Sequence, residues 1–196
     1  MRTAGSSREK TWPRIRKKSI HLLHKNGFER MNLRALASDT GIQAGSLYNY
    51  FKSKHELLSI IVCEIIEELL SNLDGALEGV ECPKERLHRF VETMVNWHAR
   101  KKKEAHISHR EIMNLTSADF QRVTKLRKRF EELLEEIIDD GVEQKLFDVR
   151  DHKLTAVMIL NMLTAISAWY KPSGRLGADT LVVEYTKAID RVVGLR

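Results

Sequence analysis

The sequence of 196 residues lacks the common catalytic and cofactor-binding signatures. It contains no HExxH zinc motif, no G-x-S-x-G nucleophile turn, no P-loop glycine pattern and no G-x-G-x-x-G dinucleotide pattern. The densest group among its eight histidines, His98, His106 and His109 with Glu111, matches neither an H-x-x-x-H helix pair nor a zinc finger. We therefore predict that the chain is not an enzyme and that it holds no metal or cofactor.

Cysteine and long apolar runs are also scarce. The two cysteines, Cys63 and Cys82, form no CxxC pair, and Cys63 lies in an apolar helical stretch where a buried free thiol is usual. Ser59 and Glu64 interrupt the run LLSIIVCEII, which is far short of the ~20 residues of a membrane span. The N-terminus shows no secretory signal pattern. We expect a cytoplasmic protein without a membrane-spanning helix.

Only three prolines and ten scattered glycines interrupt the chain, while Leu, Ile, Ala, Glu, Lys and Arg recur at helical spacings almost throughout. No strand pattern, internal repeat or low-complexity tract stands out. These features predict an all-α fold of about nine helices. We expect a helix-turn-helix domain over residues 1–56 and a larger helical domain for ligand binding and dimerisation over residues 57–196.

The N-terminal part has clear helix boundaries. Pro13 suits the first turn of a helix that Gly27 ends, and Asn32 can N-cap a second helix that ends at Gly41. A third short helix follows, and the S-x-x-E capping box at residues 53–56 begins a long fourth one. Two short helices joined by a glycine-containing turn, followed by a long helix, form the layout of a helix-turn-helix.

Helix signals continue in the C-terminal part. Pro83 begins one helix, and the T-x-x-D box at residues 116–119 begins another, which Gly141 either ends or interrupts. Asp148 or Asp151 can begin the next helix, which is apolar nearly all round and therefore needs burial on more than one side.

Charge is distributed unevenly along the chain. Residues 1–54 hold twelve Lys/Arg against three Asp/Glu, whereas the remaining residues hold 21 against 24, within a formal net charge of +6. A basic segment next to an acidic body indicates that the N-terminal part faces a polyanion. A solvated basic arm is the alternative.

Small and aromatic residues in the stretch GIQAGSLYNYFKSKHELL favour DNA as that polyanion. A helix that enters the major groove needs small residues at its leading end, with longer side chains placed to reach bases and phosphates. The tyrosines are alternatively half-buried packing residues. The candidate contact residues are Arg34, Gln43, Ala44, Gly45, Ser46, Tyr48, Tyr50 and Lys54.

The segment NGFERMNLRALASDTGIQAGSLYNYFKSKHELL resembles the DNA-binding half of the TetR family of bacterial transcriptional regulators. The match covers roughly residues 12–58, with fixed spacings across three helices and both turns. The resemblance implies that the eight candidate residues contact double-stranded operator DNA. It also implies C-terminal helices that form a ligand chamber and a homodimer.

Residue patterns in the last two helices favour the same homodimer. Small residues recur at helical spacing on a helix otherwise full of Met, Leu, Ile and Trp, which permits close helix-helix approach. The alternative is that both helices only fill the core of one protomer. The predicted interface residues are Asn161, Thr164, Ala165, Ala168, Leu181, Tyr185 and Ile189.

The C-terminal stretches HREIMNL, LEEIIDDGVEQKLFDVRD and AWYKPSGRLGADTLVVEY resemble regulators of fatty-acid or sterol breakdown within that family, many of which sense acyl-CoA thioesters. Flexible methionines suit an adaptable apolar chamber, although ordinary core packing explains each of them as well. The basic segments 100–103 and 127–129, together with Arg110, are candidates for the phosphates of a CoA, or are solvated faces. The predicted effector-binding residues are Met94, Trp97, His98, Met113, Phe120, Met158 and Met162.

The sequence therefore predicts a ligand-responsive transcriptional repressor, released from an inverted-repeat operator by a small hydrophobic effector such as an acyl-CoA. The alternative is a DNA-binding adaptor or DNA-organising protein of the same fold that has no effector.

Overall fold

The computed structural model describes the backbone of residues 4–196 and the side chains of residues 8–196. Over this range the chain is helical and contains no strand, which confirms the all-α prediction. The elements are α1 (Ala4–Arg30), α2 (Leu33–Thr40), α3 (Ala44–Leu47), α4 (Lys54–Leu77), α5 (Pro83–Arg100), α6 (Lys102–Arg110), the 3-10 helix η1 (Glu111–Asn114), α7 (Ser117–Glu143), α8 (His152–Thr164), α9 (Ile166–Trp169) and α10 (Ala178–Val192).

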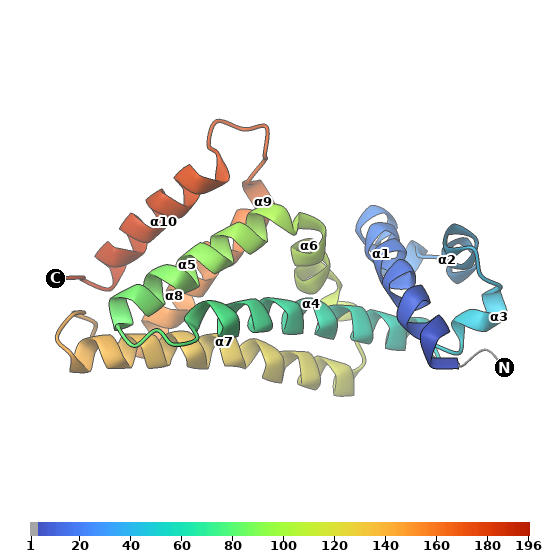
Figure 1. Ribbon diagram of the computed structural model, residues 1–196, viewed down its shortest axis with the longest axis horizontal. Helices are drawn as coiled ribbons and strands as arrows, with labels where there is room; N and C mark the ends of the chain where they lie inside the picture. Colours follow the sequence, from blue (N-terminus) through green and yellow to red (C-terminus); the bar gives the residue numbers. More distant parts are fainter. Residues whose placement is uncertain (1–3) are drawn as a thin grey trace.

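The helices form an elongated molecule with two parts (Figure 1). Helices α1 to α3 lie together at one end, and α4 runs from beneath them into a body made of α5 to α10. Within the body, α4 packs against both α5 and α7, and α10 packs on α5. The predicted domain boundary between residues 56 and 57 falls in the first turn of α4, so one continuous helix joins the two parts.

Side-chain caps begin four of the helices, α2, α4, α7 and α8, at residues that the sequence indicates. The Asn32 side chain accepts hydrogen bonds from the backbone N–H groups of Arg34 and Ala35, and Ser53 accepts one from Glu56. Thr116 caps α7 in the same way. Asp151 rather than Asp148 caps α8, because its carboxylate accepts from the backbone of the third helical residue.

The predicted start of the first helix is wrong. Helix α1 begins at Ala4 rather than Pro13, which lies inside it. Tertiary contacts support the added turns, since the Trp12 ring stacks on Tyr50 and its indole N–H donates to Glu64 at 2.8 Å. The predicted stop at Gly27 is present as a break, because this residue adopts φ 73° and ψ 167° between two helical stretches.

The long apolar helix predicted after Asp151 is divided at Ala165 into α8 and α9. Thr164 donates its hydroxyl proton to the carbonyl of Leu160, and Ser167 donates to the carbonyl of Thr164. Hydroxyl groups that bond to carbonyls of the preceding turn bend helices, which accounts for the break. Counting α8 and α9 as one bent helix gives the predicted nine α-helices in residues 4–196, with η1 as an addition.

Gly141 lies inside α7 and does not end it. A β-carbon at this position would come within 2.0 Å of the buried Phe147 ring, so only glycine allows the chain after α7 to fold back this closely. No helix in residues 4–196 combines the length and apolar character that a membrane crossing requires.

Candidate nucleic-acid interface and internal pocket

Helices α2 and α3 lie at the end of the molecule remote from the body (Figure 1), and several of their residues form an exposed surface there. Leu36, Leu47 and Phe51 are buried beneath it and fix the two helices against α1 and α4. Gly41 adopts φ 67° and makes the turn between α2 and the next helix. Of the eight candidate DNA contacts, five are exposed on this surface: Arg34, Gln43, Ala44, Gly45 and Tyr48.

The other three candidates, Ser46, Tyr50 and Lys54, are half-buried. Tyr50 stacks on Trp12, so this tyrosine packs against α1, as the packing alternative predicted. The Lys54 ammonium donates to the backbone carbonyl of Glu29 at 3.0 Å and lies 4.5 Å from the Phe28 ring centroid. A phosphate would have to compete with these contacts for Lys54.

Two further exposed residues lie on the turn between α3 and α4, namely Asn49 and Lys52. Sequence reasoning overlooked both, although the K-x-K pattern at residues 52–54 contains the signal for Lys52. Lys52 has no carboxylate partner within 4.0 Å among residues 8–196, so its ammonium is available to a phosphate.

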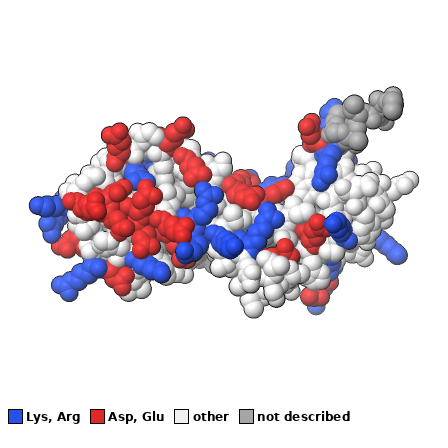
Figure 2. Space-filling view, turned by 90° about the horizontal axis from the view of Figure 1, so that it is seen from below, with Lys and Arg blue, Asp and Glu red and all other residues white. Residues whose placement is uncertain are grey.

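Acidic side chains gather on the opposite part of the molecule. Figure 2 shows them concentrated over the body, away from the N-terminal helices, with basic side chains between the two parts. A polyanion is repelled by this surface and is directed to the other end of the molecule. The C-terminal half of α7 supplies Glu131, Glu132, Glu135, Glu136, Asp139, Asp140 and Glu143.

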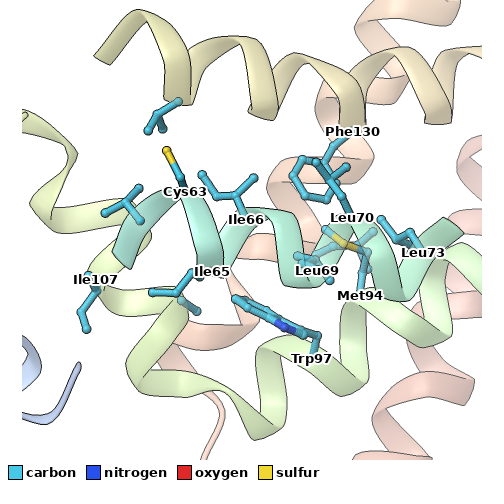
Figure 3. Close-up of a cluster of buried hydrophobic side chains, with 14 of the residues drawn as sticks. Cys63, Ile65, Ile66, Leu69, Leu70, Leu73, Met94, Trp97, Ile107 and Phe130 are labelled. Atoms are coloured by element: carbon cyan, nitrogen blue, oxygen red, sulfur yellow. The ribbon is translucent and has the colours of Figure 1, made fainter. Parts of the chain in front are cut away.

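A partly open pocket of about 200 Å³ lies in the body, where α4, α5, α6, α7 and α8 meet. Figure 3 shows Trp97, Met94 and Phe130 directed at apolar residues of α4. The apolar wall consists of Ile65, Ile66, Leu69, Met94, Trp97, Phe130 and Leu160. The polar wall consists of His98, Ser108, His109, Arg127, Glu131, Asn161 and Thr164.

His98 is the most deeply buried polar residue of the pocket. Only 3% of it is exposed, and neither ring nitrogen has a hydrogen-bond partner among the described residues. Burial, together with the nearby His109, lowers the pKa of His98 to about 3, so the imidazole is neutral at pH 7. Its edge meets the Trp97 ring at a centroid distance of 5.0 Å.

His109 and Arg127 continue this polar strip. The His98 and His109 ring centroids are 6.4 Å apart, and an Arg127 guanidinium nitrogen lies 3.4 Å from Nδ1 of His109. The same guanidinium donates to the carbonyl of Ser108 at 2.5 Å. Desolvation, followed by the Arg127 charge, lowers the pKa of His109, although this residue, unlike His98, is exposed to solvent.

The pocket contains some of the predicted effector-binding residues and excludes others. Met94, Trp97 and His98 line it, whereas Met113, Phe120, Met158 and Met162 do not. Met113 is 82% exposed, Phe120 43% and Met158 50%, because each lies on the outer side of its helix. Of the basic candidates, only Arg127 reaches the pocket.

The small-residue stripe on α8 and α9 lies on the protomer surface. Asn161, Ala165 and Ala168 are exposed, and Thr164 is half-buried. Asn161 and Thr164 also line the pocket. Large apolar side chains are also exposed on the same two helices, namely Leu154, Met158 and Trp169, and Val183 is exposed on α10.

The predicted interface residues of α10 occupy different environments. Leu181 is 2% exposed and Ile189 is 0% exposed, so both fill the core of the protomer, where α10 packs on α5. Tyr185 is half-buried. The regular apolar repeat of this helix contains two faces, and periodicity alone does not distinguish the face on α5 from the outer face with Val183.

One short segment connects the pocket to the N-terminal helices. Ser108 and His109, near the end of α6, line the pocket, and Glu111 follows directly in η1. The buried Glu111 carboxylate accepts a hydrogen bond from the backbone N–H of Phe28 at 3.2 Å and one from Asn114 at 2.8 Å. These contacts join the segment that follows α6 to the break in α1.

Known proteins share this fold over most of its length. The TetR family transcriptional regulator PfmR from Thermus thermophilus is 30% identical, with a TM-score of 0.82 over 91% of this chain and 97% of that one. The structure of AibR in complex with isovaleryl coenzyme A and operator DNA is 21% identical, with a TM-score of 0.85 over 95% and 100%.

Sequence comparison gives a consistent result. The transcriptional repressor KstR2 of Mycolicibacterium smegmatis is 26% identical over 166 residues, which cover 81% of this chain and 78% of that protein. Residues 15–60 match the model of bacterial regulatory proteins of the tetR family, and residues 81–193 match the model of the tetracyclin repressor-like C-terminal domain. The chain therefore belongs to the TetR family of bacterial transcriptional regulators.

Proposed function

We propose that this chain is a cytoplasmic repressor that binds an inverted-repeat operator as a homodimer and is released by a small acyl compound, such as an acyl-CoA. The observation that carries the proposal is the pocket with the buried, unpartnered His98, in a body joined by α4 and α6 to an exposed helix-turn-helix. Most buried side-chain polar atoms have a hydrogen-bond partner, whereas both nitrogens of His98 and the indole N–H of Trp97, which also lines the pocket, have none among the described residues.

The names of relatives support this class of effector. AibR binds isovaleryl coenzyme A and operator DNA, and KstR2 is named a repressor. The pocket of this chain combines an apolar wall with Arg127, a cation that suits the negative charge of such a compound.

In this proposal, the exposed stripe on α8 and α9 is the surface through which two protomers form the dimer. Large apolar side chains, namely Leu154, Met158 and Trp169, are exposed on the same helices as Ala165 and Ala168. Covering this apolar surface with a second copy of the chain removes it from water and is therefore favourable. Two-fold symmetry then presents two recognition helices to successive major grooves, about one helical turn or more apart.

Release requires that the effector prefer a different conformation from the one that binds DNA. Two elements connect the sites: α4 carries Ile65 and Leu69 to the pocket, and α6 carries His109 to it, with Glu111 following at the break in α1. A hundredfold preference of the effector for the released conformation corresponds to ~2.7 kcal/mol of coupling.

The first test is selection of DNA from a random pool by the purified protein, followed by footprinting of the selected sites. Two protected half-sites related by symmetry are expected, and protection of a single asymmetric half-site would contradict the dimer. Acyl-CoAs of graded length are then titrated into the complex. If the protein binds a symmetric operator and no acyl compound releases it, the adaptor or DNA-organising alternative replaces the repressor.

A further inference from the structure

His98 needs a hydrogen-bonding partner that the protein does not supply. The His98 ring lines the pocket, yet both of its nitrogens are buried and neither makes a hydrogen bond with residues 8–196. Leaving a buried donor and acceptor unpaired is unfavourable, so a ligand that carries an oxygen at this point binds better than a hydrocarbon of the same shape. The neutral imidazole has one N–H to donate to that oxygen.

The size of the cavity limits the group that enters it. An apolar cavity of ~150 Å³ holds a molecule of benzene, and pockets for whole drug-sized ligands have volumes of roughly 300–1,000 Å³. At about 200 Å³ this cavity takes a group slightly larger than benzene. A whole CoA is excluded from the cavity, whereas a short acyl chain fits between Leu69, Met94 and Phe130.

The charge near the pocket favours an anion. Arg127 is half-buried and has no carboxylate within 4.0 Å of its guanidinium among the described residues, although Glu131 one turn further along α7 also lines the pocket. Its neighbours in the pocket, His98 and His109, supply no negative charge, because an imidazole is either neutral or positive. A negative charge on the ligand would do so.

Taken with the proposed function, on which this step rests, we infer that the cavity selects a short acyl group whose carbonyl oxygen accepts a hydrogen bond from His98. The chain of the acyl group lies against Leu69, Met94 and Phe130. The negatively charged part of the compound faces Arg127 and, in a CoA thioester, continues outside the cavity. Free short-chain acids and their CoA thioesters share this chemistry.

Calorimetric titration of the full-length protein distinguishes free short-chain acids from their CoA thioesters. The probes are butyrate, isovalerate and hexanoate, their CoA thioesters, CoA alone and dodecanoyl-CoA. We expect binding of at least one of the short-chain compounds, and weaker binding of CoA alone and of dodecanoyl-CoA by about tenfold or more. Preference for dodecanoyl-CoA, or equal binding of CoA alone, would overturn the inference.

Two variants at His98 test the hydrogen bond, with a control on the same helix. His98→Phe keeps a ring of similar size and removes the donor, so binding of the preferred short-chain compound should weaken by about tenfold or more. His98→Gln retains a donor and should recover part of the loss. The control His88→Phe changes a histidine of α5 outside the pocket; it removes the contact with Asp190 of α10 and can lower the melting temperature, but it should leave binding unchanged.

Melting temperature and operator affinity without ligand, measured for each variant, show whether the protein is folded. A folded His98→Phe protein that binds the compound as tightly as the original sequence would refute the role of His98. If none of the short-chain compounds binds while footprinting still shows a symmetric operator, the inference fails and the regulator stands. If the symmetric operator is absent, the proposed function itself fails.

Discussion

The two ends of this molecule place their functional candidates in opposite environments. At the N-terminal end, Arg34, Gln43 and Tyr48 are exposed, and Tyr48 is 57% accessible to solvent. In the body, His98 is enclosed and unpartnered beside a cavity of about 200 Å³. One end is suited to a large polyanion that meets a surface, and the other to a small molecule held in a partly open pocket between helices.

This difference indicates how the two ends depend on the rest of the chain. The surface of α2 and α3 rests on a small local core, whereas the pocket exists only where five helices meet. Changes at the N-terminal surface should therefore alter DNA binding alone. Changes between the two ends, or at the dimer stripe, should affect both.

Disruption of the dimer stripe has the largest expected effect. Ala165 is exposed in the protomer, so Ala165→Glu leaves the protomer fold intact but places an unpartnered charge in a close helix contact of the proposed dimer. A penalty of several kcal/mol lowers operator affinity by about a hundredfold or more. Sedimentation should show a monomer, and Ala168→Arg should behave in the same way.

Gln121→Glu is the matched control, because it adds a charge at an exposed position of α7 away from the stripe. It should remain a dimer. Intact dimers for both Ala165→Glu and Ala168→Arg would place the interface elsewhere.

Loss of the Glu111 carboxylate should uncouple the two ends. Glu111→Ala leaves the backbone N–H of Phe28 unpartnered beside the break in α1, at a cost of about 1–3 kcal/mol in the free energy of unfolding. Operator affinity should fall by about tenfold. Glu111→Gln keeps an acceptor oxygen and should lose less on both measures, by thermal unfolding and by operator titration.

Equal losses for Glu111→Ala and Glu111→Gln would show that the carboxylate charge, rather than the hydrogen bond to Phe28, supports the junction. If both variants match the original protein in stability and operator affinity, this segment does not connect the two ends.

Substitutions on the exposed surface of α2 and α3 should separate phosphate contacts from base contacts. Arg34→Ala should weaken binding to all DNA sequences about equally and lower the salt dependence by about one unit per half-site. Gln43→Ala should instead change preference at particular base pairs, by about 1–3 kcal/mol. Binding to a panel of operator variants at several salt concentrations measures both.

Lys54→Ala and Lys52→Ala sharpen the same comparison. Lys54 already contacts Glu29 and the Phe28 ring, so its removal should lower the melting temperature as well as DNA affinity. Lys52 is exposed, and its removal should lower only DNA affinity. If Lys54→Ala changes neither the melting temperature nor the salt dependence of DNA binding, Lys54 contributes neither to stability nor to phosphate contact.

The pH dependence of stability gives the smallest expected effect. Because the pKa of His98 falls from 6.5 to about 3 on folding, the unfolded chain binds more protons between these values. The free energy of unfolding should therefore fall as pH decreases below 6.5, by about 1 kcal/mol from this group between pH 6 and pH 5. His98→Phe should flatten that slope, and an unchanged slope in denaturant unfolding would show that His98 is not buried as a neutral ring.

Sequence reasoning performed differently at the two ends for a physical reason. The caps at Asn32 and Ser53 and the turn at Gly41 depend on neighbours within a few residues, so the helix boundaries of the N-terminal part follow from local chemistry. The start of α1 could not be predicted in this way, because the contacts that stabilise its first turns, from Trp12 to Tyr50 and Glu64, involve residues far along the chain.

In the body, the same local rules gave the helices but not which face of each helix is buried. Met158 and Met113 resembled pocket residues by composition and lie on outer faces, whereas Arg127 and Asn161 line the pocket from α7 and α8. Helical periodicity identifies a stripe without identifying its partner. Which face of each helix lines the pocket is decided only by how α4, α5, α6, α7 and α8 pack against one another.

The central claim is that the pocket and the DNA-binding surface are coupled, and linkage tests it most directly. The affinity of the protein for its preferred short-chain acyl compound is measured by calorimetry, with and without saturating operator DNA. The account predicts that operator weakens the binding of the compound by the same factor by which the compound weakens operator binding, of order a hundredfold. Equal affinities with and without operator would contradict it.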